Sequence, residues 1–66
     1  MQNYRIVVRG RLTGALAEMF DGLQIRSCNS ETELRGAISD QAELFGYLLR
    51  LRDLGIQLIS VNLVAS

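Results

Sequence analysis

The 66-residue sequence contains no lysine, histidine, proline or tryptophan, and Cys28 is its single cysteine. One cysteine excludes an internal disulfide, and the lack of histidine removes the commonest general base and a frequent metal ligand. Seven arginines balance seven acidic residues, so the formal net charge is zero. Nucleic-acid-binding domains usually have a basic excess. We therefore expect no metal, no cofactor and no nucleic-acid partner, and we expect no enzyme activity from these residues.

Long apolar runs are also missing. No stretch approaches the ~20 residues of a membrane-spanning helix, and the N-terminus lacks a signal-peptide pattern. An unpaired cysteine without an export signal fits a reducing compartment, so we expect a cytoplasmic protein that does not enter a membrane. The length predicts one domain over residues 1–66. A chain this short buries only about 60% of its unfolded surface, so tight packing or oligomerisation has to stabilise it.

The first half of the chain predicts strand, helix and strand. Residues 4–12 alternate, with Tyr4, Ile6, Val8 and Leu12 on one face and Arg5, Val7, Arg9 and Arg11 on the other. Gly10 falls on the inner face, where a helix or ligand could approach closely. Thr13 is expected to cap a short helix over residues 14–20, which Gly22 ends. A second strand is expected over residues 23–28.

The second half predicts a hairpin, a long helix and a closing strand. Asn29 and Ser30 are turn residues between the second strand and a third strand over residues 31–38. Asp40 and Glu43 have the spacing of a capping box at the start of a helix. Gly55 is expected to end this helix in a Schellman motif. A last strand covers roughly residues 57–64.

This order of elements predicts an α+β fold. We expect a ferredoxin-like βαββαβ sandwich, with four antiparallel strands, two helices on one face, and the first and third strands in the centre. Antiparallel pairing of these two strands would bring Arg11 near Glu31 and Arg9 near Glu33 as ordinary sheet-stabilising pairs. The alternative is that the exposed arginines bind phosphate or an acidic partner.

Two sets of residues are candidates for binding. The first is the turn after the first strand, where Gly10, Arg11, Thr13 and Gly14 could present backbone N–H groups to an anion, although the two glycines could serve geometry alone. The second is a surplus of apolar residues, which predicts a contact surface between subunits. Its members are Phe45, Leu49, Ile59, Val61 and Leu63. Because the closing strand is apolar on both parities, either a bulge lies near residues 58–59 or both faces are covered. No catalytic residue is predicted, and Cys28 is expected to be a partly exposed spectator thiol.

Two resemblances add to this interpretation. The run IVVRGRLTGALAEMFDGLQI, residues 6–25, is similar to the first half of an ACT domain, in which a turn glycine opens a helix that often binds an amino acid at a dimer interface. Gly14 stands at that glycine. The run DQAELFGYLLRLRDLGIQLISVN, residues 40–62, resembles the ending of small uncharacterised actinobacterial proteins. The resemblances imply a ferredoxin-like fold and a cytoplasmic setting.

The leading functional hypothesis is a non-enzymatic module that self-associates, most simply as a homodimer, and binds a partner protein or small ligand. One alternative is an ACT-like regulatory sensor of a small amino-acid-like ligand at residues 10–16. Another is an accessory subunit of a neighbouring enzyme.

Overall fold

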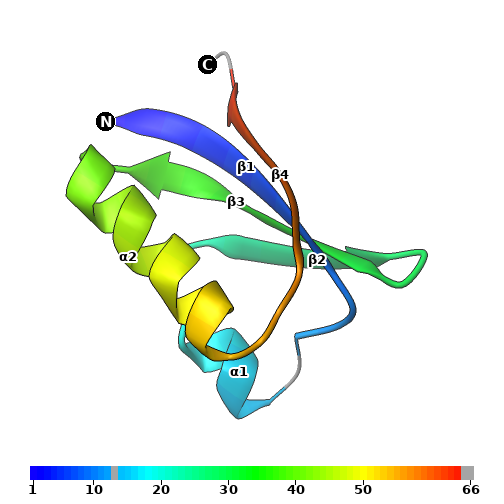
Figure 1. The fold of residues 1–66 in the computed structure, drawn as a ribbon. Helices are drawn as coiled ribbons and strands as arrows, with labels where there is room; N and C mark the ends of the chain where they lie inside the picture. Colours follow the sequence, from blue (N-terminus) through cyan, green and yellow to red (C-terminus); the bar gives the residue numbers. More distant parts are fainter. Residues whose placement is uncertain (13, 65–66) are drawn as a thin grey trace.

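The computed structural model describes residues 1–12 and 14–64, which form one four-stranded antiparallel sheet and two helices (Figure 1). The elements in chain order are β1 (Gln2–Arg9), α1 (Ala15–Glu18), β2 (Gln24–Cys28), β3 (Glu31–Ile38), α2 (Gln41–Asp53) and β4 (Leu58–Val64). The strand order is β2-β3-β1-β4. The α+β class and the central position of the first and third strands are thus confirmed.

The apolar core lies between the sheet and the helices. Ile6 and Val8 from β1 and Leu34 and Ile38 from β3 are fully or almost fully buried, because strand alternation turns these side chains to the same face. They meet an apolar stripe of α2, in which Leu44 and Leu51 are buried and Leu48 is partly buried. Phe20, just after α1, is fully buried in the same cluster. Among the described residues, no helix lies on the opposite face of the sheet (Figure 1).

Helix α2 has the predicted start and end. The Asp40 side chain accepts a hydrogen bond from the Glu43 N–H at 2.8 Å. The Glu43 carboxylate accepts from the N–H of Ser39 at 2.9 Å, one residue earlier than in a standard capping box. At the other end, Gly55 has φ +72° and its N–H donates to the Arg52 carbonyl, while the Ile56 N–H donates to the Leu51 carbonyl, both at 3.0 Å. These two bonds define the Schellman motif.

The hairpin between β2 and β3 is also confirmed. Asn29 and Ser30 have φ values of +52° and +66°, as a two-residue type I′ turn requires. Residues 28 and 31 then pair directly across the ladder. Further along β3, Gly36 lies under Leu23, and a Cβ atom at Gly36 would stand 2.9 Å from the Leu23 Cδ2 atom. The absence of a side chain at Gly36 therefore allows residues 22–23 to pack closely against β3.

The segment after β1 differs from the prediction. The strand ends at Arg9 because Gly10 has φ +94°, which breaks the extended backbone, so Leu12 reaches the core from the following loop. A Cβ at Gly10 would have no atom within 4 Å, so no close approach occurs at this glycine. Helix α1 has only four residues and its N-cap is Gly14, which makes the expected helix over residues 14–20 too long. The predicted cap Thr13 lies outside the described residues.

Strand β4 contains a bulge, which was one of the two alternatives that its apolar pattern left open. Val7 of β1 pairs with Ser60, and the next residue, Val8, pairs with Leu58, so Ile59 is an extra residue on β4. This extra residue changes the parity of the strand. The bulge explains why the apolar residues of β4 occupy both parities in the sequence.

Candidate functional site

The sheet face without helices is a charged surface. The pairing registers place Arg5, Val7 and Arg9 of β1 on this face, together with residues 31, 33 and 35 of β3 and residues 24, 26 and 28 of β2. The face therefore holds four arginines and two glutamates. Tyr4 pairs with Gly36 on the helix-covered face, so the open face lacks the exposed aromatics with which RNA-binding sheets stack bases.

The register between the central strands corrects the predicted ion pairs. Arg9 stands opposite Glu31, and Val7, not Arg9, stands opposite Glu33. Arg11 lies beyond the end of β1 and takes no part in the ladder. The expected register assumed that the first strand continued to Leu12. Because β1 ends at Arg9, its residues pair with β3 two positions away from the expected register.

The ion pair on this face instead joins Arg5 and Glu33 diagonally across the strands. The Arg5 Nε–H donates to the Glu33 Oε2 atom. This hydrogen bond is the main reason why the pKa of Glu33 lies below its usual value, and the charges of Arg35 and Arg26 lower it further against the opposing effect of burial. Glu33 therefore remains ionised and holds the Arg5 guanidinium in place.

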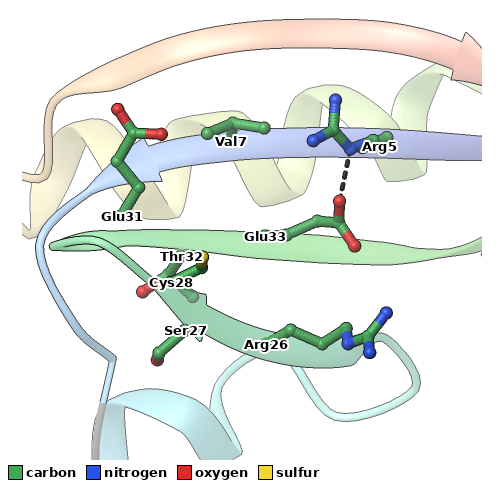
Figure 2. Close-up of a pocket in the computed structure, with 8 residues that line it drawn as sticks. All are labelled: Arg5, Val7, Arg26, Ser27, Cys28, Glu31, Thr32 and Glu33. Carbon is green, nitrogen blue, oxygen red and sulfur yellow. Dashed lines mark hydrogen bonds and ion pairs between the residues drawn. The ribbon is translucent and has the colours of Figure 1, made fainter.

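A shallow, open depression of about 420 Å³ lies on the β1, β3 and β2 part of this face. Its charged groups lie at two ends, with Arg5, Arg26 and Glu33 at one end and Glu31 at the other, and Val7 stands between them (Figure 2). Val7 is only 7% exposed although the pairing register places it on the open face. Arg26 makes no ion pair with any residue that the structure describes. The thiol of Cys28 reaches the same depression and is free and exposed.

The turn predicted to bind a ligand is separate from this depression. Gly10 and Gly14 have positive φ values of +94° and +54°, so both glycines serve backbone geometry. The Gly10 N–H is already occupied, because it donates a hydrogen bond to the Ser30 carbonyl at 2.6 Å. Arg11 is exposed, and Thr13 lies outside the described residues. Since α1 has four residues, the turn does not open a helix long enough to attract an anion through its dipole.

The predicted contact residues lie on α2 and β4. Phe45 and Leu49 are 54% and 48% exposed, and Ile59 and Leu63 are 40% and 59% exposed, whereas Val61 is half-buried against the core. Leu63 and Val61 pair with Tyr4 and Ile6, so they belong to the helix-covered face of the sheet at an edge that the helices leave open.

The position of Phe45 and Leu49 follows from the contacts on the other flank of α2. The Tyr47 ring packs 6.0 Å from the Phe20 ring, just after α1, and Arg50 donates to the Met19 carbonyl at 2.8 Å. Residues 45 and 49 lie roughly 160° around the helix axis from Tyr47. We call the surface of Phe45 and Leu49 the α2 flank, and it faces away from the α1 segment.

Other kinds of site find little support in residues 1–12 and 14–64. This part of the chain contains no group of three or more side chains suited to hold a metal ion. None of its helices has the length and apolar character needed to span a membrane.

Sequence reasoning missed two features of the open face. Val7 is buried although it lies on the face that alternation assigned to the outside of the sheet. Arg26 joins the Glu33 cluster because β2 pairs with β3 in a register that places Arg26 opposite Glu33. The two-residue turn at Asn29–Ser30 was the available signal for that register, since a type I′ turn makes residues 28 and 31 a pair.

Together, the fold and these surfaces define a small α+β domain with an open charged sheet face and an exposed apolar edge. The chain belongs to the family described as "Domain of unknown function (DUF8691)", whose model matches residues 3–62. Comparisons with curated proteins and with solved structures found no match.

Proposed function

We propose that this domain is a non-enzymatic module that self-associates as a homodimer through the α2 flank and β4. The observation that supports the proposal is the exposure of large apolar side chains on these two elements. Phe45, Leu49, Ile59 and Leu63 are each at least 40% exposed, whereas water-exposed apolar patches of this kind usually mark interaction sites. A chain with zero formal net charge has little electrostatic repulsion to oppose association.

The fold assignment is part of the same proposal. We place the domain in the ferredoxin-like class, because its elements follow the order βαββαβ and β1 and β3 occupy the centre of the sheet. In this arrangement β4 is an edge strand, available for contact with a second subunit. The free thiol of Cys28 suits a reducing compartment, so the proposed setting is the cytoplasm.

Size-exclusion chromatography with light scattering tests the proposal. The measured mass is expected to rise toward that of two chains as the concentration increases through the micromolar range, and a monomer throughout this range would contradict the proposal. Leu49→Glu should weaken the dimer because it places a charge on the α2 flank. Ala15→Glu is the matched control, since it adds the same charge at an exposed helical position outside the proposed surface. An unchanged dimer with Leu49→Glu would exclude the α2 flank from the interface.

A second candidate function is recognition of a small carboxylate or phosphate group in the open-face depression. Arg5 uses its Nε–H on Glu33, so its terminal N–H groups point to no described carboxylate, and Arg26 has no described ion-pair partner. In this role the ligand of the sensor hypothesis would bind on the sheet and not at the turn of residues 10–14. The role of accessory subunit stays a prediction, to be tested by co-purification with the products of neighbouring genes.

A thermal-shift screen with amino acids and nucleotides tests this second function, since a ligand that binds only the native state raises Tm. Arg26→Gln should remove the shift, whereas Arg11→Gln removes an arginine that does not line the depression and should preserve it. A shift that persists in Arg26→Gln would place the ligand elsewhere.

A further inference from the structure

Strand β4 is an edge strand that neither a charged residue nor a proline protects. It is the last strand in the order β2-β3-β1-β4, so one side of its backbone has no strand beside it among the described residues. Natural edge strands are commonly blunted by charged residues or proline. The seven residues LISVNLV contain neither. The bulge at Ile59 lies near the start of the strand and leaves residues 60–64 regular. This regular part of β4 can accept another strand.

The backbone hydrogen bonds show which groups of β4 face outward. The N–H of Arg9 donates to the Gln57 carbonyl at 2.9 Å, whereas the N–H of Gly10 donates to the Ser30 carbonyl on the β3 side. Because N–H directions alternate along a strand, the N–H groups of Val7, Arg5 and Asn3 also point to β4.

The partners of these β1 residues are Ser60, Asn62 and Val64. Directly opposite residues of this kind exchange both hydrogen bonds, so these three residues direct their backbone groups to β1. The residues between them, Val61 and Leu63, therefore direct their N–H and C=O groups away from the sheet. Their side chains lie on the helix-covered face, where Leu63 is 59% exposed.

We infer that β4 pairs antiparallel with β4 of a second copy around a two-fold axis at Asn62. This inference rests on the proposed self-association and specifies its geometry. In this register Val61 pairs with the partner's Leu63, and Leu63 pairs with the partner's Val61. Each of the two pairs forms both of its hydrogen bonds, so every outward group of Val61 and Leu63 gains a partner. The result is a continuous eight-stranded sheet.

The side chains are compatible with this register on both faces. On the helix-covered face, each half-buried Val61 meets an exposed Leu63 of the other copy, which removes apolar surface from water. On the open face, Asn62 stands opposite its own copy, and Ser60 stands opposite the partner's Val64. No charged residue of β4 enters the contact. The area is small, so a dissociation constant in the micromolar range is expected.

Cysteine cross-linking tests this register in a Cys28→Ser background. Asn62 would form a non-hydrogen-bonded pair with its copy, in which the Cα atoms stand about 4.5 Å apart, within the range of a disulfide. Asn62→Cys is therefore expected to give a covalent dimer on mild oxidation, with reduction restoring the single chain. Val61→Cys is the matched control, because residue 61 and its copy would be diagonal neighbours about 7–8 Å apart and should cross-link poorly.

Val61→Pro supplies a second test that does not depend on oxidation. It removes an outward N–H and leaves the β1–β4 ladder intact, so circular dichroism should show a native fold. The dimer loses two hydrogen bonds, one at each copy of residue 61, so its dissociation constant should rise at least about tenfold.

The outcomes separate the inference from the proposed function. A native dimer in which Val61→Cys cross-links and Asn62→Cys does not would overturn the register. A native dimer that neither variant cross-links and that Val61→Pro does not weaken would overturn edge pairing but leave self-association standing. A native monomer would overturn both.

Discussion

The hydroxyl of Thr32 donates a 2.6 Å hydrogen bond to the carbonyl oxygen of Gly10, and this bond ties β3 to the turn where the chain leaves β1. Thr32 is fully buried. The Gly10 N–H also donates to the Ser30 carbonyl at 2.6 Å. Both the N–H and the carbonyl group of Gly10 are thus hydrogen-bonded to the β2–β3 hairpin. These two bonds fix the direction in which the chain leaves the sheet before the short helix α1.

Thr32→Val should destabilise the domain because it keeps the shape of the side chain but leaves the Gly10 carbonyl without this donor. The expected cost is about 1 kcal/mol of unfolding free energy, and up to ~3 kcal/mol if water cannot reach the carbonyl. Urea denaturation measures it. The control is Ser27→Ala at the exposed cross-strand neighbour of Thr32, which should change stability by less than about 0.5 kcal/mol. Equal stability of Thr32→Val and the native protein would show that the bond contributes nothing.

Gly36→Ala should be clearly destabilising. Its new Cβ would stand 2.9 Å from the Leu23 Cδ2 atom and 3.2 Å from the Gly22 carbonyl oxygen. The leucine methyl can move, but the carbonyl belongs to the backbone and yields less easily. We expect a loss of about 1–3 kcal/mol, as is usual when a tightly packed site is overfilled. The midpoint of urea unfolding would fall accordingly, and an unchanged midpoint would contradict the close approach of residues 22–23 to β3.

Gly46→Ala should have the opposite effect. Gly46 lies in the interior of α2, and a Cβ there would meet no atom within 4 Å. Alanine loses less backbone entropy than glycine when a helix forms, so the expected gain is about 1 kcal/mol. The same unfolding experiment measures both glycine variants. Destabilisation by Gly46→Ala would mean that this side of α2 is covered in the assembled protein.

The elements that the sequence predicted well are those with local signals. Each of these signals acts on backbone groups only a few residues away. The structure has a helix cap at Asp40, a Schellman motif at Gly55 and a type I′ turn at Asn29–Ser30. The apolar residues of β4 likewise indicated an irregularity, which the structure places at Ile59.

Other features depended on contacts between distant segments. The end of β1 was placed too far along the chain because Leu12 continues the apolar alternation. Gly10 has already ended the strand, and Leu12 enters the core from a loop. The ion pair of Arg5 with Glu33 follows only from the β1–β3 register. The backbone groups of β4 that face outward could be assigned only from the hydrogen bond between the Arg9 N–H and the Gln57 carbonyl.

The ion pair makes the stability of the domain depend on pH in a definable way. The hydrogen bond from Arg5, with smaller effects of Arg35 and Arg26, holds the pKa of Glu33 below the value of 4.5 expected for an unperturbed glutamate. A carboxyl group whose pKa is lower in the folded state than in the unfolded state stabilises the fold above the unfolded pKa. This contribution is lost as the pH falls through the folded pKa.

Glu33→Gln should therefore destabilise the domain at pH 7 by about 0.2–1 kcal/mol, the range of exposed ion pairs, and the difference from the native protein should shrink below about pH 4.5. Urea unfolding at a series of pH values measures this difference. Added salt should reduce it at pH 7, because an exposed pair is screened. Glu31→Gln is the matched control, since Glu31 lies on the same strand and face without an ion pair to any described residue. If both variants lose stability equally at pH 7, net charge rather than the Arg5 contact is responsible.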